Sequence, residues 1–167
     1  MKVIIINGSP KAKGNTATAL HEVEKTLQQQ GIETEWIHVG HMDIRGCIAC
    51  NRCWDTGICG FNDIVNEISQ KMKDADGLVI GSPVYFATPN GTLLALLDRL
   101  FYSNLHTDWS MKAGASVSIA RRGGATTTMD TLNKYFLKTN MPVAPSQYWS
   151  IAHGTSPGEV NLDEEGM

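Results

Sequence analysis

The sequence predicts an α/β fold in which helices cover both faces of a parallel sheet, and three observations lead to it. A β-branched run at residues 3–6 precedes the turn residues Gly8, Ser9 and Pro10, and such a short apolar run is typical of a strand buried on both faces. Strand and helix patterns then alternate along the chain, as in βαβ units. The 167 residues, 42% hydrophobic and 19% charged, are ordinary for one globular domain. We therefore expect a single domain over residues 1–167.

The first half of the chain predicts two strands and two helices. After the strand at residues 3–6, apolar positions at helical spacing predict a helix over residues 15–30, and Gly31 follows it in the usual C-terminal position. Residues 33–39 read as a second strand, whose polar character is typical of a sheet edge. Beyond a cysteine-rich stretch, Asn62 or Asp63 is a suitable N-cap for a helix running to about residue 73.

The second half continues the alternation. Residues 78–81 and 113–120 read as central strands, and residues 93–101 as a helix that is apolar nearly all round, typical of burial on more than one side. A further helix begins at residues 126–128 and ends before Pro142. The fifth strand is expected at residues 148–151 in preference to 143–144. Only the acidic residues 163–165 resemble a helix start beyond it. We therefore expect that a terminal helix is missing, which puts the stability of a lone monomer in doubt.

The turn after the first strand has the features of a phosphate-binding loop. The first amides of a helix have no internal partner and carry the positive end of the helix dipole, so an anion can bind there. The spacing matches neither the P-loop nor the G-x-G-x-x-G fingerprint. A plain strand–turn–helix with a capping Asn is the alternative. The residues expected to meet a phosphate are Ser9, Lys11, Gly14, Asn15 and Thr16.

This G-S-P-x-x-x-G-N-T pattern resembles the flavin mononucleotide (FMN) loop of the flavodoxin-like NAD(P)H-dependent FMN reductases. The resemblance covers nearly the whole chain and implies a three-layer sandwich with five parallel strands in the order 2-1-3-4-5. The N-G-x-L-x-x-L-x-D-R pattern of the same family matches at residues 90–99, which implies fold or interface roles for Asp98 and Arg99. His153 is a weaker candidate for contact with a flavin or nicotinamide.

Two further loops should meet the flavin ring, because ligands of open α/β sheets bind outside the carboxyl ends of the strands. The third strand ends in apolar and aromatic residues, Pro83, Val84, Tyr85 and Phe86. The fourth ends in Arg121, Arg122, Gly123 and Gly124. Positive charge at the O2/N1 edge of a flavin stabilises its reduced form, so this loop should help set the redox potential. The alternative for the end of the third strand is a set of core aromatics, and the alternative for residues 121–124 is a solvated turn.

The cysteine-rich loop at residues 46–60 contains a C-x2-C-x2-C-x5-C run formed by Cys47, Cys50, Cys53 and Cys59. Closely spaced thiolates can converge on one inorganic core. The run resembles the cluster motif of the iron–sulfur flavoproteins, a branch of the same family, which implies a [4Fe–4S] cluster. Zinc is the alternative metal, although its cysteines usually come as two separated pairs. A metal-free site also stays open.

The function implied is that of an FMN-dependent oxidoreductase, which takes electrons from NAD(P)H and passes them to an iron–sulfur cluster or to a small acceptor such as a flavin or quinone. The cofactor carries the chemistry, so no catalytic side chain is expected. A non-enzymatic electron carrier between protein partners is the competing interpretation, and a zinc-stabilised binding module without flavin is a third. The sequence does not indicate the acceptor or the choice between NADH and NADPH.

Charge and composition limit the partners. A net charge of −3 and the lack of a basic patch interleaved with aromatics argue against nucleic acid. The apolar N-terminal run is too short for a signal peptide or a membrane span. We expect a cytoplasmic protein, in which the four cysteines stay reduced, and a homodimer or homotetramer.

Overall fold

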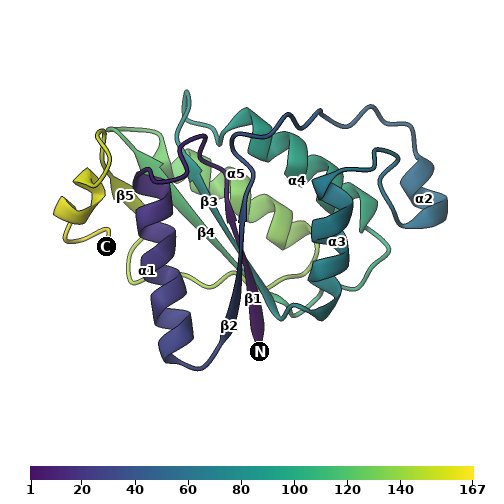
Figure 1. Cartoon of the computed structure of the whole chain (residues 1–167), viewed down its shortest axis with the longest axis horizontal. Helices are drawn as coiled ribbons and strands as arrows, with labels where there is room; N and C mark the ends of the chain where they lie inside the picture. The colour runs from purple at the N-terminus through teal and green to yellow at the C-terminus, as the bar shows by residue number, and fades with distance from the viewer.

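A five-stranded parallel sheet in the order β2-β1-β3-β4-β5 forms the middle layer of the computed structural model, which describes residues 1–167 (Figure 1). This order confirms the predicted topology. The strands are β1 (Lys2–Asn7), β2 (Glu33–His38), β3 (Gly77–Pro83), β4 (Ala113–Ala120) and β5 (Ile151–His153). The helices are α1 (Asn15–Gln29), α2 (Arg52–Thr56), α3 (Ile64–Asp74), α4 (Gly91–Ser103), α5 (Ala125–Lys138) and the 3₁₀ turn η1 (Glu159–Leu162).

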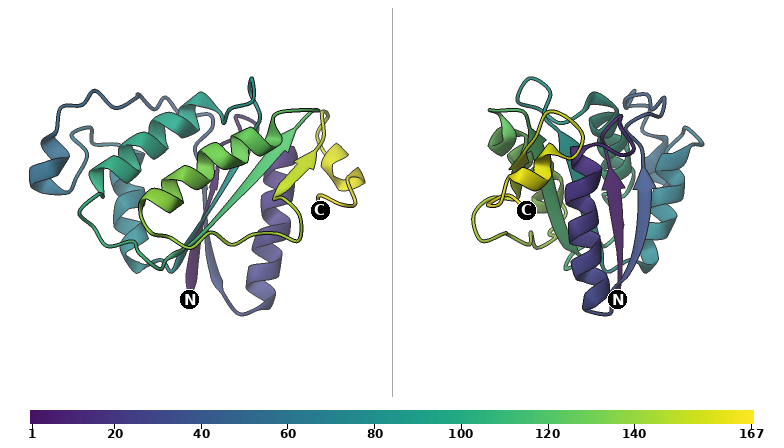
Figure 2. Two further views of the ribbon diagram at one scale, coloured as in Figure 1. Left: turned by 180° about the vertical axis from the view of Figure 1, so that it is seen from behind. Right: turned by 60° about the vertical axis from the view of Figure 1, so that its left-hand side comes forward.

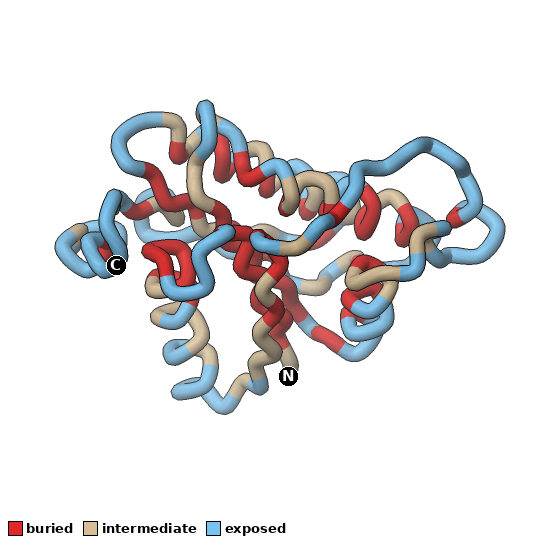
Figure 3. The backbone as a smooth tube through the Cα atoms, turned by 45° about the horizontal axis from the view of Figure 1, so that its top comes forward, coloured by how far each residue is buried: buried red, intermediate tan, exposed pale blue.

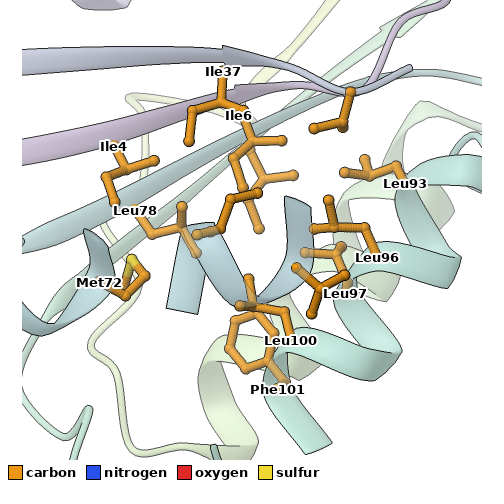
Figure 4. Packing of buried hydrophobic residues seen from close by; sticks show 14 of the residues in the cluster. Ile4, Ile6, Ile37, Met72, Leu78, Leu93, Leu96, Leu97, Leu100 and Phe101 are labelled. Atoms are coloured by element: carbon orange, nitrogen blue, oxygen red, sulfur yellow. The ribbon is translucent and has the colours of Figure 1, made fainter. Parts of the chain in front are cut away.

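Alternate residues of β1 face opposite sides of the sheet, because side chains alternate along a strand. Ile4 and Ile6 point into the main core, where Leu78 also lies, while Val3 and Ile5 pack with Leu20 of α1. The main core is completed by helices α3, α4 and α5, and Figure 4 shows Leu93, Leu96, Leu97 and Leu100 of α4 lying against the strand residues. Figure 2 shows α4 and α5 crossing one face of the sheet and α1 lying on the other. Helices therefore lie on both faces of the sheet, as predicted.

The fifth strand begins later than expected. It spans Ile151–His153 rather than residues 148–151, and the alternative segment contributes only an isolated bridge between Gly114 and Val143. Tyr148 and Trp149 are exposed and contact each other, with ring centroids 4.6 Å apart. The prediction for this strand was wrong because the two aromatic residues lie outside the sheet.

The chain after β5 forms the turn η1, and residues 163–165, expected to start a helix, form a turn. Val160 of η1 is buried against Ala19 of α1 and Ala152 of β5. A depression of about 860 Å³ lies between α1 and residues 144–151. None of the helices combines the length and apolar character that crossing a bilayer requires.

Candidate functional site

The predicted phosphate loop lies between β1 and α1 and is held together by local hydrogen bonds to its own side chains and backbone. Asn7 Oδ1 accepts a hydrogen bond from the Ser9 amide at 3.0 Å, and Ser9 Oγ accepts one from the Lys11 amide at 3.2 Å. The Gly14 amide donates to the Lys11 carbonyl at 3.2 Å. Gly14 is the N-cap of α1 and no side chain caps the helix. The first amides of α1 are thus available to an anion.

Two residues at the end of β2 hold this loop in place, and sequence reasoning missed both. His38 Nε2 lies 2.7 Å from the Ser9 carbonyl oxygen, which only accepts, so this nitrogen is the donor. Gly40 packs so closely that a Cβ there would lie 2.2 Å from the carbonyl carbon and oxygen of Ser9. The one signal that could have identified them is their position at the carboxyl end of a strand next to β1.

The remaining predicted phosphate ligands differ in surroundings. Lys11 is exposed, whereas Asn15 and Thr16 are buried at the start of α1. Asn15 Oδ1 accepts hydrogen bonds from the amides of Gly158 and Val160, at 2.9 and 3.4 Å. The Asn15 oxygen therefore anchors the segment after β5, and only its Nδ2 group is left for another partner.

The two predicted ring loops lie against each other on the same edge of the sheet. The Val84 amide donates to the Ile119 carbonyl at 2.9 Å. A Cβ on Gly124, whose φ is +89°, would lie 2.8 Å from the Cα atom of Ala87. Phe86 and Ala87 have positive φ values, 51° and 61°, at the tip of a tight turn. A cavity of about 360 Å³ lies between these loops, lined by Val84, Phe86, Ala87, Arg121, Arg122 and Gly123.

The Phe86 ring is fully exposed and Tyr85 is 46% exposed. A fully exposed aromatic ring on a left-handed backbone is an arrangement that stability alone does not favour. Such features collect at binding sites, where a ligand supplies the missing contact. Of the predicted ring residues, Tyr85 and Phe86 therefore present their apolar surface to the rim, while Pro83 and Val84 are half-buried.

A second cavity on this rim, of about 430 Å³, contains Arg121 and His153. His153 Nδ1 lies 3.1 Å from Asp163 Oδ2, and the His153 amide donates to the same oxygen at 2.7 Å. Burial alone would raise the pKa of Asp163, but hydrogen bonds from His153 and from the Gly166 amide lower it. His153 is thus held on the rim in the same cavity as Arg121, and its contact with a flavin or nicotinamide stays a prediction.

This rim fits a flat ring carrying a phosphate. Asn7 Nδ2, at the end of β1, is buried without a partner, and no side chain caps the first amides of α1. Both groups are donors, which an anionic tail would satisfy. The ring loops and the phosphate loop follow β3, β4 and β1, which are adjacent in the sheet. One ligand can therefore reach both regions.

The four cysteines lie in a long loop that Figure 3 colours almost entirely as exposed. All four are free thiols and line one small cavity together with Arg99 and Phe61. No three potential ligands are gathered closely enough to coordinate a single metal ion. A cluster spaces its thiolates around several irons, and four cysteines around one cavity are the donor set it needs. Burial raises the pKa of the Cys53 thiol, and the neighbouring cysteines add to this.

The loop carries features that the sequence did not indicate. The five-residue helix α2 lies inside it, and Ala49 and Asn51 have positive φ values of 53° and 57°. The Asn66 carboxamide holds the other end, since its Oδ1 accepts from the Cys59 amide at 3.0 Å and its Nδ2 donates to the Cys59 carbonyl at 3.1 Å. The chain is therefore bent back on itself around the cavity.

Of the two residues given fold or interface roles, Asp98 accepts a hydrogen bond from the Tyr135 hydroxyl at 2.5 Å. Burial, and then this carboxylate, raise the pKa of Tyr135 far above its usual value. Arg99 instead contacts the cysteine loop directly, because its Nε atom lies 3.2 Å from Cys59 Sγ. Asp98 joins α4 to α5, whereas Arg99 belongs to the candidate metal site.

Comparison with known families gives a match to the NADPH-dependent FMN reductase family over residues 1–156. Among curated proteins, an iron–sulfur flavoprotein of Methanocaldococcus jannaschii is 36% identical over all of this chain and 90% of its own length. An iron–sulfur flavoprotein of Archaeoglobus fulgidus is 27% identical over 99% of this chain and 74% of its own length.

Among solved structures, RosB with bound 8-demethyl-8-formylriboflavin 5′-phosphate has a TM-score of 0.75 at 20% identity. The match covers 97% of this chain and 69% of RosB. At this identity the likeness supports the fold alone, and it agrees with the flavodoxin-like order of the sheet.

Proposed function

Because the chain belongs to the NADPH-dependent FMN reductase family and is an FMN-dependent oxidoreductase, we propose that NAD(P)H is its electron donor. We further propose that it passes electrons to an iron–sulfur cluster or to a small acceptor such as a flavin or quinone. The observation that carries the flavin site is the uncapped start of α1, which shares one sheet edge with the ring loops. Asn7 Nδ2, at the end of β1, is buried without a partner and is a further free donor.

In this proposal the phosphate of FMN is bound by the loop between β1 and α1, through Ser9, Lys11, Gly14, Asn15 and Thr16. The ring lies against the two loops that contact each other, through Pro83, Val84, Tyr85, Phe86, Arg121, Arg122, Gly123 and Gly124. When bound, FMN supplies the redox chemistry, so the side chains bind and orient it and none serves as an acid, base or nucleophile. The arginines favour negative charge at the ring edge.

The phosphate role is tested by Thr16→Val, which removes a hydroxyl at nearly constant volume. A hydrogen bond to a charged group contributes about 1.5–3 kcal/mol, so we expect FMN to bind roughly 10- to 100-fold more weakly. Thr26→Val is the matched control, because Thr26 lies on the same helix and its hydroxyl bonds only the Glu22 carbonyl, at 3.0 Å. Flavin fluorescence titration measures both. Equal affinity in the two variants would contradict the proposed phosphate site.

We propose that Cys47, Cys50, Cys53 and Cys59 hold a [4Fe–4S] cluster. The shared cavity and the similarity to iron–sulfur flavoproteins support it. The test is anaerobic purification followed by a visible spectrum with iron and zinc analysis. About four irons per chain are expected on the proposed stoichiometry, and replacing Cys53 by Ser should abolish them. Zinc instead of iron would favour a structural metal site.

The donor is tested by steady-state oxidation of NADH and NADPH by protein loaded with FMN, with a quinone as acceptor. Turnover with either nucleotide is expected. If neither NADH nor NADPH is oxidised by protein that binds FMN normally, the result would favour a carrier that exchanges electrons with protein partners. Repeating the assay with free flavin in place of the quinone shows which of the two acceptors is reduced faster.

We also propose a homodimer or homotetramer and a cytoplasmic location. Large apolar side chains at the surface, including Phe86 at 100% exposure, Trp54 at 56% and Ile48 at 55%, support self-association. Four free cysteines support a reducing compartment. Light scattering of the purified protein measures the mass, and a monomer at micromolar concentration would contradict the first proposal.

A further inference from the structure

Arg99 is an unusual residue for the interior of an apolar helix. It lies on α4 among leucines and its side chain is only 1% exposed. Arginine is almost never fully buried unless its charge is paired. Its position therefore needs partners that satisfy both its charge and its donors.

The guanidinium has partners from three parts of the cysteine-loop region. Nη1 and Nη2 bind the carboxylate oxygens of Asp63 at 2.7 and 2.8 Å, a two-pronged ion pair. Nη1 also donates to the Arg45 carbonyl at 3.3 Å, and Nη2 to the Phe61 carbonyl at 3.4 Å. The Phe61 ring lies below the guanidinium, with the central carbon 5.0 Å from the ring centre. Nε, the remaining donor, points at Cys59 Sγ at 3.2 Å.

The contact with Cys59 has a chemical meaning when that sulfur is a metal ligand. A thiolate bound to iron keeps part of its negative charge, and reduction of the cluster adds one more electron. An N–H donor on a cationic group stabilises the reduced state more than the oxidised state, and hydrogen bonds to the sulfurs are one of the means by which proteins set cluster potentials. Asp63 acts in the opposite sense, since its carboxylate offsets the charge of Arg99.

From this arrangement we propose that Arg99 is a positioning residue for the cluster, which orients Cys59 through its Nε–H and raises the reduction potential, while Asp63 limits the increase. This inference rests on the proposed cluster and adds to it the residue pair that sets its potential. The pair comes from α4 and from the N-cap of α3, outside the cysteine run.

The test is a potentiometric titration of reconstituted protein, followed by electron paramagnetic resonance of the reduced cluster, with iron content measured in parallel. Arg99→Gln removes the charge and the Nε–H. We expect the equilibrium constant for reduction to fall about tenfold, which is about 59 mV for a one-electron couple. Arg99→Lys keeps the charge without the planar fork and should give a smaller decrease, which provides a second variant if Gln impairs folding.

Two matched variants separate this role from a structural one. Asp63→Asn removes the opposing charge and keeps the N-cap of α3, because Asn caps helices as well as Asp does, so the potential should rise. Arg45→Gln removes an equal charge nearby. The Arg45 guanidinium also lies over the Phe61 ring, with its central carbon 4.5 Å from the ring centre. The Arg45 side chain is exposed and makes no hydrogen bond to a cysteine sulfur, so the shift in potential for Arg45→Gln should be much smaller than that for Arg99→Gln.

Opposite shifts for Arg99→Gln and Asp63→Asn support the proposal, because mere loosening of the loop would move both potentials the same way. Shifts of the same sign, equal shifts in Arg99→Gln and Arg45→Gln, or a wild-type potential in all variants would overturn it. Failure of wild-type protein to incorporate iron is a separate result, seen before any variant is made, and it would refute the proposed cluster itself.

Discussion

Gly40 offers the sharpest test of how the phosphate loop is held. A Cβ added there would lie 2.2 Å from the Ser9 carbonyl carbon and oxygen and 2.3 Å from the Gly8 carbonyl oxygen. Ordinary van der Waals contact begins at 3.4 Å, so Gly40→Ala must push the loop by about 1 Å. The obstructing atoms are backbone, which has no alternative rotamer. Overpacking usually costs about 1–3 kcal/mol, and we expect the upper end of this range.

For a domain of this size, about 3 kcal/mol corresponds to a decrease in Tm of roughly 6–12 °C. FMN should also bind at least tenfold more weakly, on the order of 1.4 kcal/mol, because the displaced atoms belong to the phosphate loop. Thermal unfolding without FMN, followed by circular dichroism, measures the change in Tm. A flavin fluorescence titration of the folded protein at about 20 °C measures the change in FMN affinity.

Gly91→Ala is the matched control for this substitution. Gly91 begins α4 and has no atom within 4 Å of an added Cβ, so its Tm should stay within a few degrees of the wild-type value. If Gly40→Ala melts and binds FMN as the wild type does, the close approach of Gly40 to the phosphate loop is wrong.

Three further predictions concern the rim and the sheet edge. Asn15→Ala leaves the amide of Gly158 without its acceptor and should cost about 1–3 kcal/mol; limited proteolysis should then cleave first after β5, and an unchanged cleavage pattern would contradict this. The pKa of Glu35 is lowered by Lys2 first and then by Lys71. Ionised Glu35 therefore stabilises the folded protein fully above pH 4.5, and this stabilisation is lost as the pH falls through the lowered pKa. Urea unfolding should show Glu35→Gln to be less stable than the wild type at pH 7 and equally stable once Glu35 is protonated. Phe86→Asn should relieve about 1 kcal/mol of backbone strain and raise Tm while weakening flavin binding, and a lower Tm would show that the φ of Phe86 is not strained.

Sequence reasoning predicted the sheet because its signal is local. The runs at β1, β3 and β4 are apolar and short, and the order of the sheet followed from the resemblance. The bounds of the edge strand β5 were harder to predict, because they depend on its register with β4. Ser118 pairs with Ile151 and Ala120 with His153, and the β-propensity of Tyr148 and Trp149 does not decide this register.

The same distinction holds for the site. The loops at the carboxyl ends of β1, β3 and β4 could be predicted, because fold topology brings them to one edge. The contact of His38 with Ser9 joins residues 29 positions apart, and that of Arg99 with Cys59 joins residues 40 positions apart. Such contacts leave no periodic pattern in the sequence. The short helix α2 was missed since five residues with one buried side chain show no helical periodicity.

The anchoring of the cysteine loop bears on how the proposed cluster would be lost and regained. The Arg99 guanidinium bonds the carbonyl of Arg45 on one side of the cysteines and that of Phe61 on the other, so both ends of the loop are fastened to α4 by protein atoms alone. A segment with fixed ends has already lost most of its loop-closure entropy. Protein that has lost the proposed cluster should therefore accept iron and sulfide at neutral pH, with no cycle of denaturation and refolding.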